Sequence, residues 1–179
     1  MKKIFHPELG ELELKRKKGR KSISIQYKYA EGKFSVSFPY NCPINIAIGF
    51  ANSRIDWMRK TKLKSQEKII ARNIADVNKK SAIEKFKEIA NIICSTTGLS
   101  YTRLKVRKMK TLWGSCSVDN IINLNLYLAN LPSDLQYYVI LHELCHTIEK
   151  NHSKRFWALM NKYWKESLKM DKELERYVP

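Results

Sequence analysis

Three of the four histidines in the chain, His142, His146 and His152, lie within one short stretch of sequence. His142 and His146 are four residues apart, so on a helix they share one face, one turn apart, and can bind the same ion. Glu143 would lie beside that ion, where its carboxylate can accept a proton from a bound water. Three protein ligands leave a fourth coordination position open, which is typical of catalytic zinc. The stretch therefore predicts a hydrolytic site with one Zn²⁺ per chain, and other divalent first-row metals are compatible with the same nitrogen ligands.

The surrounding sequence predicts two helices that would hold these residues. Ser133 is expected as the N-cap of the first helix, with Gln136 three residues later in a capping-box pattern. We expect this helix to end at Asn151, which tolerates the left-handed conformation, and a reversal there to bring His152 back toward the other histidines. Ser153 is expected to cap the second helix. The apolar residues of that helix would pack against the metal site: Phe156, Trp157, Met160, Tyr163 and Trp164.

Several short motifs around the histidines occur together in a known family. They are Trp113–Ser117, Ile122–Asn125, His142–His146, Asn151–Ser153 and Phe156–Trp157. In this combination the chain resembles the YgjP-like metallopeptidases, which are related to the SprT and WLM zincin-like groups. Leu112 stands where the family often has arginine, and Cys145 stands where alanine is usual. The resemblance covers nearly the whole chain and implies a zincin-like fold with metal-dependent hydrolysis of peptide bonds.

Other residues are candidates for contact with a substrate. Zincin-like enzymes commonly bind an extended peptide along a sheet edge beside the metal helix, and the predicted strand with Asn123 and Asn125 could provide that edge. The alternative is an ordinary strand whose two asparagines face solvent. Gly114 allows an unusual backbone angle in the turn before this strand, from which Ser115 could reach the cleft.

The negative charge that develops during hydrolysis must be stabilised by a hydrogen-bond donor or a cation, and the sequence offers several. The candidates are Arg107, Ser115, Tyr137 and Tyr138.

The hydrophobic pattern predicts an α+β fold. Apolar residues alternate with polar ones at 12–14, 23–27 and 34–38, which indicates short antiparallel strands, and they recur at helical spacing at 44–58 and 82–93. Further strands are expected at 101–109 and 121–126. Residues 1–78 are expected to form a basic region of β-hairpins and a helix. Residues 79–179 are expected to form a zincin-like catalytic region with helices packed on a small mixed sheet, the two regions making one compact unit.

The charge of the chain is strongly positive. Lys and Arg total 34 against 17 Asp and Glu, which gives a net charge of +17. Such a field attracts polyanions, so nucleic acid and nucleotides are candidate partners beside a protein or peptide substrate. The alternative is a lysine-rich surface without a polyanionic partner. No helix-turn-helix, zinc-finger or RNA-recognition signature is present, which argues against sequence-specific reading of bases.

Composition limits the location of the protein. The 179 residues, of which 44% are hydrophobic, are enough for one core with a small appended layer. No apolar run reaches the roughly 18 residues that span a bilayer, and the basic start lacks the apolar stretch of a secretory signal. The four cysteines are widely spaced, as expected for buried thiols in a reducing compartment. We therefore expect a cytoplasmic protein that does not enter membranes.

Three functions from different classes are compatible with these features. The first is a zinc peptidase in which Glu143 is the general base. The second is a metal-dependent nucleotide pyrophosphatase that uses the same activated water against a phosphoanhydride. The third is a nucleic-acid-associated protein with a non-catalytic zinc site. Chelator-sensitive cleavage of a loosely folded protein would indicate the first, release of phosphate or pyrophosphate from a nucleotide the second, and salt-dependent DNA binding without hydrolysis the third.

Overall fold

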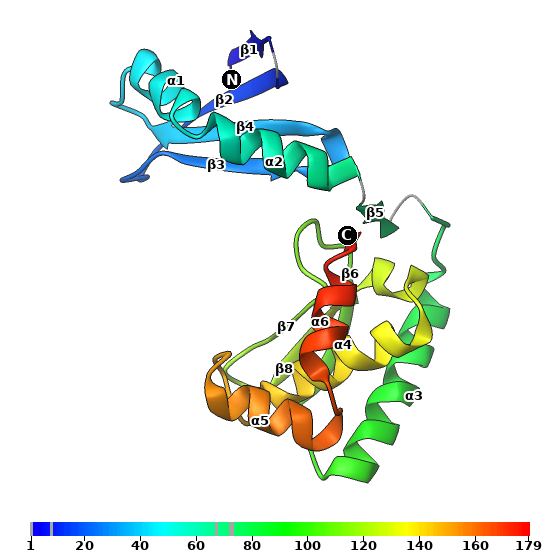
Figure 1. Ribbon diagram of the computed structural model, residues 1–179. Helices are drawn as coiled ribbons and strands as arrows, with labels where there is room; N and C mark the ends of the chain where they lie inside the picture. Colours follow the sequence, from blue (N-terminus) through cyan, green and yellow to red (C-terminus); the bar gives the residue numbers. More distant parts are fainter. Residues whose placement is uncertain (1, 8, 67, 72–73) are drawn as a thin grey trace. The chain divides into compact units, whose positions relative to one another are not determined.

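The computed structural model describes residues 2–7, 9–66, 68–71 and 74–179. The chain forms two compact units, Met1–Lys68 and Ile69–Pro179 (Figure 1). From the sequence we expected a boundary between residues 78 and 79. Among the described residues, no helix is both long and apolar enough to cross a bilayer.

The N-terminal unit is built on a four-stranded sheet in the order β1-β2-β4-β3. Its strands are β1 (Lys2–His6), β2 (Gly10–Lys17), β3 (Ser24–Lys28) and β4 (Lys33–Pro39). The predicted antiparallel pairing is correct for β3 with β4, but β2 pairs parallel with β4. The sequence did not predict β1, which pairs antiparallel with β2. Alternation along a strand indicates which face is buried and contains no information on which strand becomes its neighbour.

Two helices, α1 (Ile44–Asn52) and α2 (Ile55–Gln66), follow the sheet (Figure 1). The alternating apolar residues of β2 and β4 are buried in two small clusters with residues from these helices. Glu13 is also buried and forms ion pairs with Lys28 at 2.6 Å and with Lys15 and Lys33 at 2.9 Å. These bonds hold the pKa of Glu13 well below its ordinary value, and the bond from Lys28 has the largest effect.

The C-terminal unit combines helices with a three-stranded sheet in the order β6-β8-β7, which confirms the α+β class. The sheet contains β6 (Arg103–Arg107), β7 (Gly114–Cys116) and β8 (Ile121–Asn125). The helices are α3 (Lys79–Thr97), α4 (Ser133–Cys145), α5 (Lys154–Tyr163) and α6 (Ser167–Leu174), with a 3₁₀ turn at Leu126–Asn130. A two-stranded parallel pair, β5 (Ile69–Ile70) with β9 (Tyr177–Val178), completes the unit.

The core of this unit surrounds α4. Along α3, the residues at helical spacing are buried as predicted, and the helix begins at an Asn78 cap and ends at Gly98, whose φ is 74°. Residues of α4 are buried on nearly every side of the helix. A helix that is apolar all round belongs in the centre of a fold, so the sheet and the other helices hold α4 rigidly.

The structure corrects both predicted ends of α4. The helix is preceded by Pro132, and no side chain caps it; Gln136 instead donates to the carbonyl oxygen of Leu131 at 2.6 Å. It ends at Cys145, well before Asn151, because a tight turn follows in which the amides of Ile148 and Glu149 donate to the Cys145 carbonyl oxygen. Asn151 is not among the described residues with positive φ. The reversal therefore occurs earlier than predicted, directly after the second histidine.

Candidate metal centre

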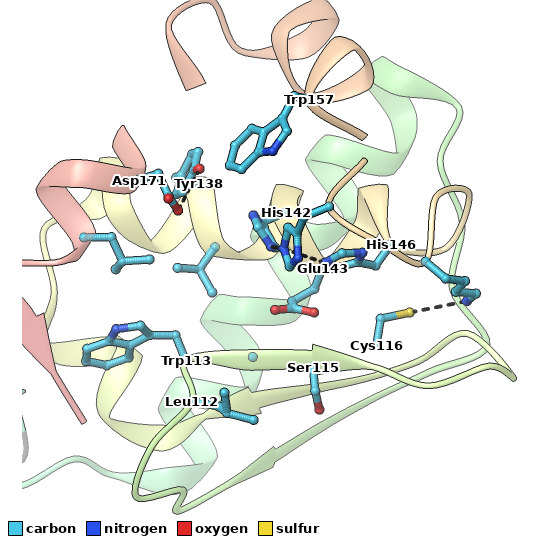
Figure 2. A pocket seen from close by; sticks show the side chains of 15 residues that line it. Leu112, Trp113, Ser115, Cys116, Tyr138, His142, Glu143, His146, Trp157 and Asp171 are labelled. Carbon is cyan, nitrogen blue, oxygen red and sulfur yellow. Dashed lines mark hydrogen bonds between the residues drawn. The ribbon is translucent and has the colours of Figure 1, made fainter. Parts of the chain in front are cut away.

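The three histidines meet at one point between α4 and the segment before α5 (Figure 2). The Nε2 atom of His152 lies 2.8 Å from Nε2 of His142 and 3.2 Å from Nε2 of His146. All three candidate ligand atoms lie within 4.8 Å of one another. Tetrahedral zinc with Zn–N bonds of about 2.05 Å separates its nitrogen ligands by about 3.3 Å. The spacing of the three side chains thus fits a single small ion.

The turn after α4 orients the second histidine. Nδ1 of His146 lies 2.8 Å from the carbonyl oxygen of Glu149. Because a carbonyl oxygen only accepts, Nδ1 is the protonated nitrogen, and the lone pair on Nε2 is free for a metal. The ring of Phe156 stacks on His146, with centroids 4.4 Å apart, and also contacts His142 and His152. As predicted, Ser153 caps α5, accepting from the Phe156 amide at 3.4 Å, and this cap fixes the start of the helix that covers the site.

Burial keeps His142 in the form that binds metal. Desolvation is the main cause that lowers the pKa of His142 to about 3, and the neighbouring histidines contribute less. The imidazole is therefore neutral at neutral pH. Its Nδ1 is buried without a hydrogen-bond partner. Desolvation also lowers the pKa of His146. Since a metal competes with protons for these nitrogens, the fold reduces that competition.

Glu143 projects from α4 toward β7 and is 6% exposed. A Cβ atom at position 114 would lie 2.5 Å from Oε1 and 2.6 Å from Cγ of Glu143, well inside van der Waals contact at about 3.5 Å. Gly114 does not have a positive φ, so the predicted role in an unusual backbone angle is wrong. The glycine is needed for space: only its missing side chain lets the strand approach the carboxylate. The other oxygen, Oε2, has no protein partner, and burial raises the pKa of Glu143 to about 8.

The strand with the two asparagines is not at the edge of the sheet. β8 lies between β6 and β7, which corrects the predicted edge position. Asn125 is fully buried and donates to the carbonyl oxygens of Met109 and Leu112, both at 2.8 Å, so it holds a loop and cannot reach a substrate. Asn123 donates to Oγ of Ser115 at 3.3 Å. The edge strand beside the metal helix is β7, which the sequence interpretation treated as a turn.

Some of the remaining residues predicted to contact the substrate line the cavity, and others lie outside it. Ser115 and Tyr138 line the cavity that contains the histidines, although the Ser115 hydroxyl points away from them (Figure 2). Arg107 is exposed on β6, at the opposite edge of the sheet from β7, and does not line the cavity. Tyr137 also lies outside the lining and contacts Trp164, with ring centroids 5.5 Å apart. Of the four candidate donors, only Ser115 and Tyr138 are therefore near the site.

The cavity has a volume of about 620 Å³ and includes residues that the sequence did not suggest. Asp171 and Leu174 come from α6, and Trp157 comes from α5. Lys150 lines the cavity as well, and its ammonium donates to the Asn120 side chain at 2.5 Å and to the Ser117 carbonyl oxygen at 2.9 Å. Sequence spacing does not connect Asp171 and Leu174 to the histidine motif, because tertiary packing alone brings α6 to the site.

Comparison with known proteins assigns the family. Residues 59–177 match the model of the YgjP-like metallopeptidase domain. The chain therefore belongs to the YgjP-like metallopeptidase family, and the resemblance noted in the sequence is confirmed. A search of curated proteins finds no match.

Two solved structures are similar to part of the chain. One is the metallopeptidase zymogen abylysin of Pyrococcus abyssi, with 19% identity, a TM-score of 0.46, and coverage of 51% of this chain and 93% of that chain. The other is the metallopeptidase zymogen jannalysin of Methanocaldococcus jannaschii, with 26% identity, a TM-score of 0.46, and coverage of 51% and 94%.

Replacing Gly114 by alanine is expected to displace the Glu143 carboxylate, because the new methyl group overlaps it. A displacement of about 1 Å costs on the order of 100-fold in turnover. Metal content, measured by mass spectrometry, should stay at the wild-type level. Gly49→Ala is the matched control, since no atom lies within 4 Å of the added methyl group. Full activity of the Gly114→Ala protein would show that Glu143 does not depend on this contact.

The metal-free protein is expected to lose stability as the pH rises from about 7 to 8. In this window the folded chain retains a proton on Glu143, whose pKa is raised to about 8, while the unfolded chain has lost it. His142 and His146, whose pKa values are lowered from the ordinary 6.5, add a slope of opposite sign while the unfolded chain still binds protons there, and this slope fades as the pH approaches 8. Thermal or urea unfolding with chelator should give a slope of at most about 1.4 kcal/mol per pH unit. The Glu143→Gln protein should lack this slope; equal slopes would contradict the buried-carboxylate interpretation.

Proposed function

We propose that the chain is a zinc-dependent peptidase in which Glu143 is the general base and His142, His146 and His152 hold the metal. The observation that carries the proposal is the convergence of three Nε2 atoms and one buried carboxylate on a single cavity. The donor set fits zinc, since it offers three imidazole nitrogens, and one of the three rings is oriented by the Glu149 carbonyl oxygen. When bound, the metal supplies Lewis-acid activation of water and polarises the carbonyl group under attack.

The chain's own residues supply the proton transfers. Glu143 takes the proton of the attacking water at Oε2, the oxygen that lacks a protein partner. As oxygen adds to the carbonyl carbon and the C–N bond breaks, Glu143 passes that proton to the leaving nitrogen. Its low exposure excludes bulk water, so the proton stays within the site. The products are one carboxylic acid and one amine, which accounts for both atoms of hydrogen in the water.

The free edge of β7 supports an extended peptide as the substrate. β7 pairs with β8 on one side only, and its residues Gly114, Ser115 and Cys116 all line the cavity. Main-chain pairing along such an edge binds many sequences and would present a peptide bond to the histidines.

Hydrolysis of phosphoanhydrides is the less favoured alternative. An enzyme of that kind usually adds magnesium held by carboxylates. Among the described residues, the histidine cluster is the one group of three or more side chains that could hold a metal. Apart from Lys150, whose ammonium is already bound by Ser117 and Asn120, the cavity lining offers no Lys or Arg side chain for a triphosphate.

Glu143→Gln is expected to lower hydrolysis of casein by about 100-fold or more, because the amide cannot accept the proton. Zinc content should be unchanged, since the three ligands are intact. The assay compares zinc-loaded wild-type and variant proteins on casein and on a panel of nucleoside triphosphates. Casein cleavage that disappears in the variant is the expected result. Full retention by a metal-loaded variant would overturn the role of Glu143, and release of phosphate or pyrophosphate would favour the alternative chemistry.

A groove in the N-terminal unit favours a second function, binding of single-stranded nucleic acid. The groove has a volume of about 700 Å³ and is lined by Lys2, Leu14, Lys15, Arg16, Lys17, Phe38, Tyr40 and Ile44. The Arg16 guanidinium lies 5.5 Å from the ring centroid of Phe38 and 5.9 Å from that of Tyr40. The Tyr40 side chain is 69% exposed, so a base could stack on it while the cations contact phosphates.

Labelled oligothymidylate is expected to bind this groove with an affinity that falls as salt increases. Tyr40→Ala should weaken binding by about fivefold to 100-fold, because stacking contributes about 1–3 kcal/mol per base. Lys17→Gln should weaken it and lower the salt slope by about one. Lys60→Gln, the same charge change at an exposed position of α2, is the control. Equal losses in the two glutamine variants would mean non-specific attraction by overall charge.

A location in the cytoplasm is part of the proposal. All four cysteines are free, and Cys145 is buried in the core. Unpaired thiols of this kind are typical of a reducing compartment.

A further inference from the structure

Asp171 is a carboxylate in the cavity that the proposed chemistry does not use. It lies on α6, is half-buried, and accepts a long hydrogen bond of 3.4 Å from the hydroxyl of Tyr138. None of the ion pairs formed by the described residues includes Asp171. In a chain with twice as many basic as acidic residues, a half-buried carboxylate without a cation is unusual.

The charges of the cavity are separated in space. Asp171 and Tyr138 lie together on one side of His142, whereas Cys116 lies on the other side of the histidines (Figure 2). Lys150 donates to the Cys116 thiol group at 3.9 Å, so the ammonium belongs to the Cys116 side. Asn120 and Ser117 already bind that ammonium. Lys150 therefore does not neutralise Asp171, and the Asp171 side of the cavity is locally negative.

Apolar side chains make up much of the cavity wall, and one of them, Leu174, lies on α6 with Asp171. Five of the residues that line the cavity have apolar or aromatic side chains: Leu112, Trp113, Val139, Trp157 and Leu174. A carboxylate at the end of an apolar wall suits a group with an alkyl stem and a charged tip, as in lysine and arginine. The α-amino group of a peptide has the charge but no stem to cover that wall.

We propose that Asp171 selects substrates with a lysine or arginine side chain beside the bond that is cut. This inference rests on the proposed peptidase function and assigns its substrate class. The alkyl stem would lie on the apolar wall while the ammonium or guanidinium pairs with the Asp171 carboxylate, which Tyr138 holds in place. The peptide main chain would pair with the edge of β7, next to Glu143.

The test uses capped peptides built on a cleavage site mapped in casein. The flanking residue is lysine, norleucine or glutamate, where norleucine has the alkyl stem of lysine without the charge. Zinc-loaded wild-type protein is expected to have a kcat/KM for the lysine peptide about 10- to 100-fold above that for norleucine, as expected for a hydrogen-bonded charge. Asp171→Asn should bring this ratio close to one, and Asp171→Lys should reverse the preference toward glutamate. Asp134→Asn, the same charge change at an exposed position of α4, should keep the wild-type ratio.

A binding measurement separates selection from turnover. Fluorescence anisotropy on the Glu143→Gln protein should give tighter binding of the lysine peptide than of the norleucine peptide, and adding Asp171→Asn should abolish the difference. Zinc content and thermal unfolding of each variant identify any loss of fold.

The outcomes that overturn this inference differ from those that overturn the peptidase. Cleavage with equal kcat/KM for lysine and norleucine, or a ratio unchanged by Asp171→Asn, would exclude the role of Asp171 and leave the peptidase intact. A preference that requires a free N-terminus and ignores the side chain would assign the carboxylate to the α-amino group. Absence of any cleavage that depends on Glu143 would overturn the peptidase itself.

Discussion

The contact between Gly114 and Glu143 is the constraint on which the site depends. Because position 114 has no side chain, the main chain of β7 lies directly against the Glu143 carboxylate. The same strand is the edge of its sheet, and its residues line the cavity. One close approach therefore brings together the proposed general base and the strand that would pair with a peptide. A larger residue would displace the Glu143 carboxylate or push β7 away from α4.

Burial of α4 determines the protonation of the groups it presents. Desolvation favours neutral forms, so His142 is kept ready for a metal while Glu143 resists ionisation. A bound dication reverses the second effect by favouring the carboxylate, which links metal binding to the stability of the fold. The tight turn after Cys145 contributes as well, since it places the Glu149 carbonyl against His146 and selects the tautomer with Nε2 free.

The sequence predicted the parts of the site that depend on local spacing. The positions of His142 and His146 on one helix face, the Ser153 cap and the α+β class follow from periodicity and local hydrogen bonding. The sequence did not predict features that depend on packing between distant segments. We took β8 rather than β7 for the edge strand. Asp171 was missed because α6 reaches the cavity only through tertiary contacts. The role of Gly114 was also misjudged, since a glycine in a sequence does not reveal whether it provides a backbone angle or space.

The surface of the chain and the cavity favour ligands of opposite charge. The +17 field and the basic groove beside Tyr40 attract polyanions over a distance set by the ionic strength. Within the cavity, the ammonium of Lys150 is already bound by Asn120 and Ser117, and none of the ion pairs of the described residues includes Asp171. The groove and the cavity belong to different units of the chain, so they can bind groups of opposite charge. In this arrangement the surface would localise the protein on an anionic partner, while the cavity would select cationic segments of the polypeptide that it cuts.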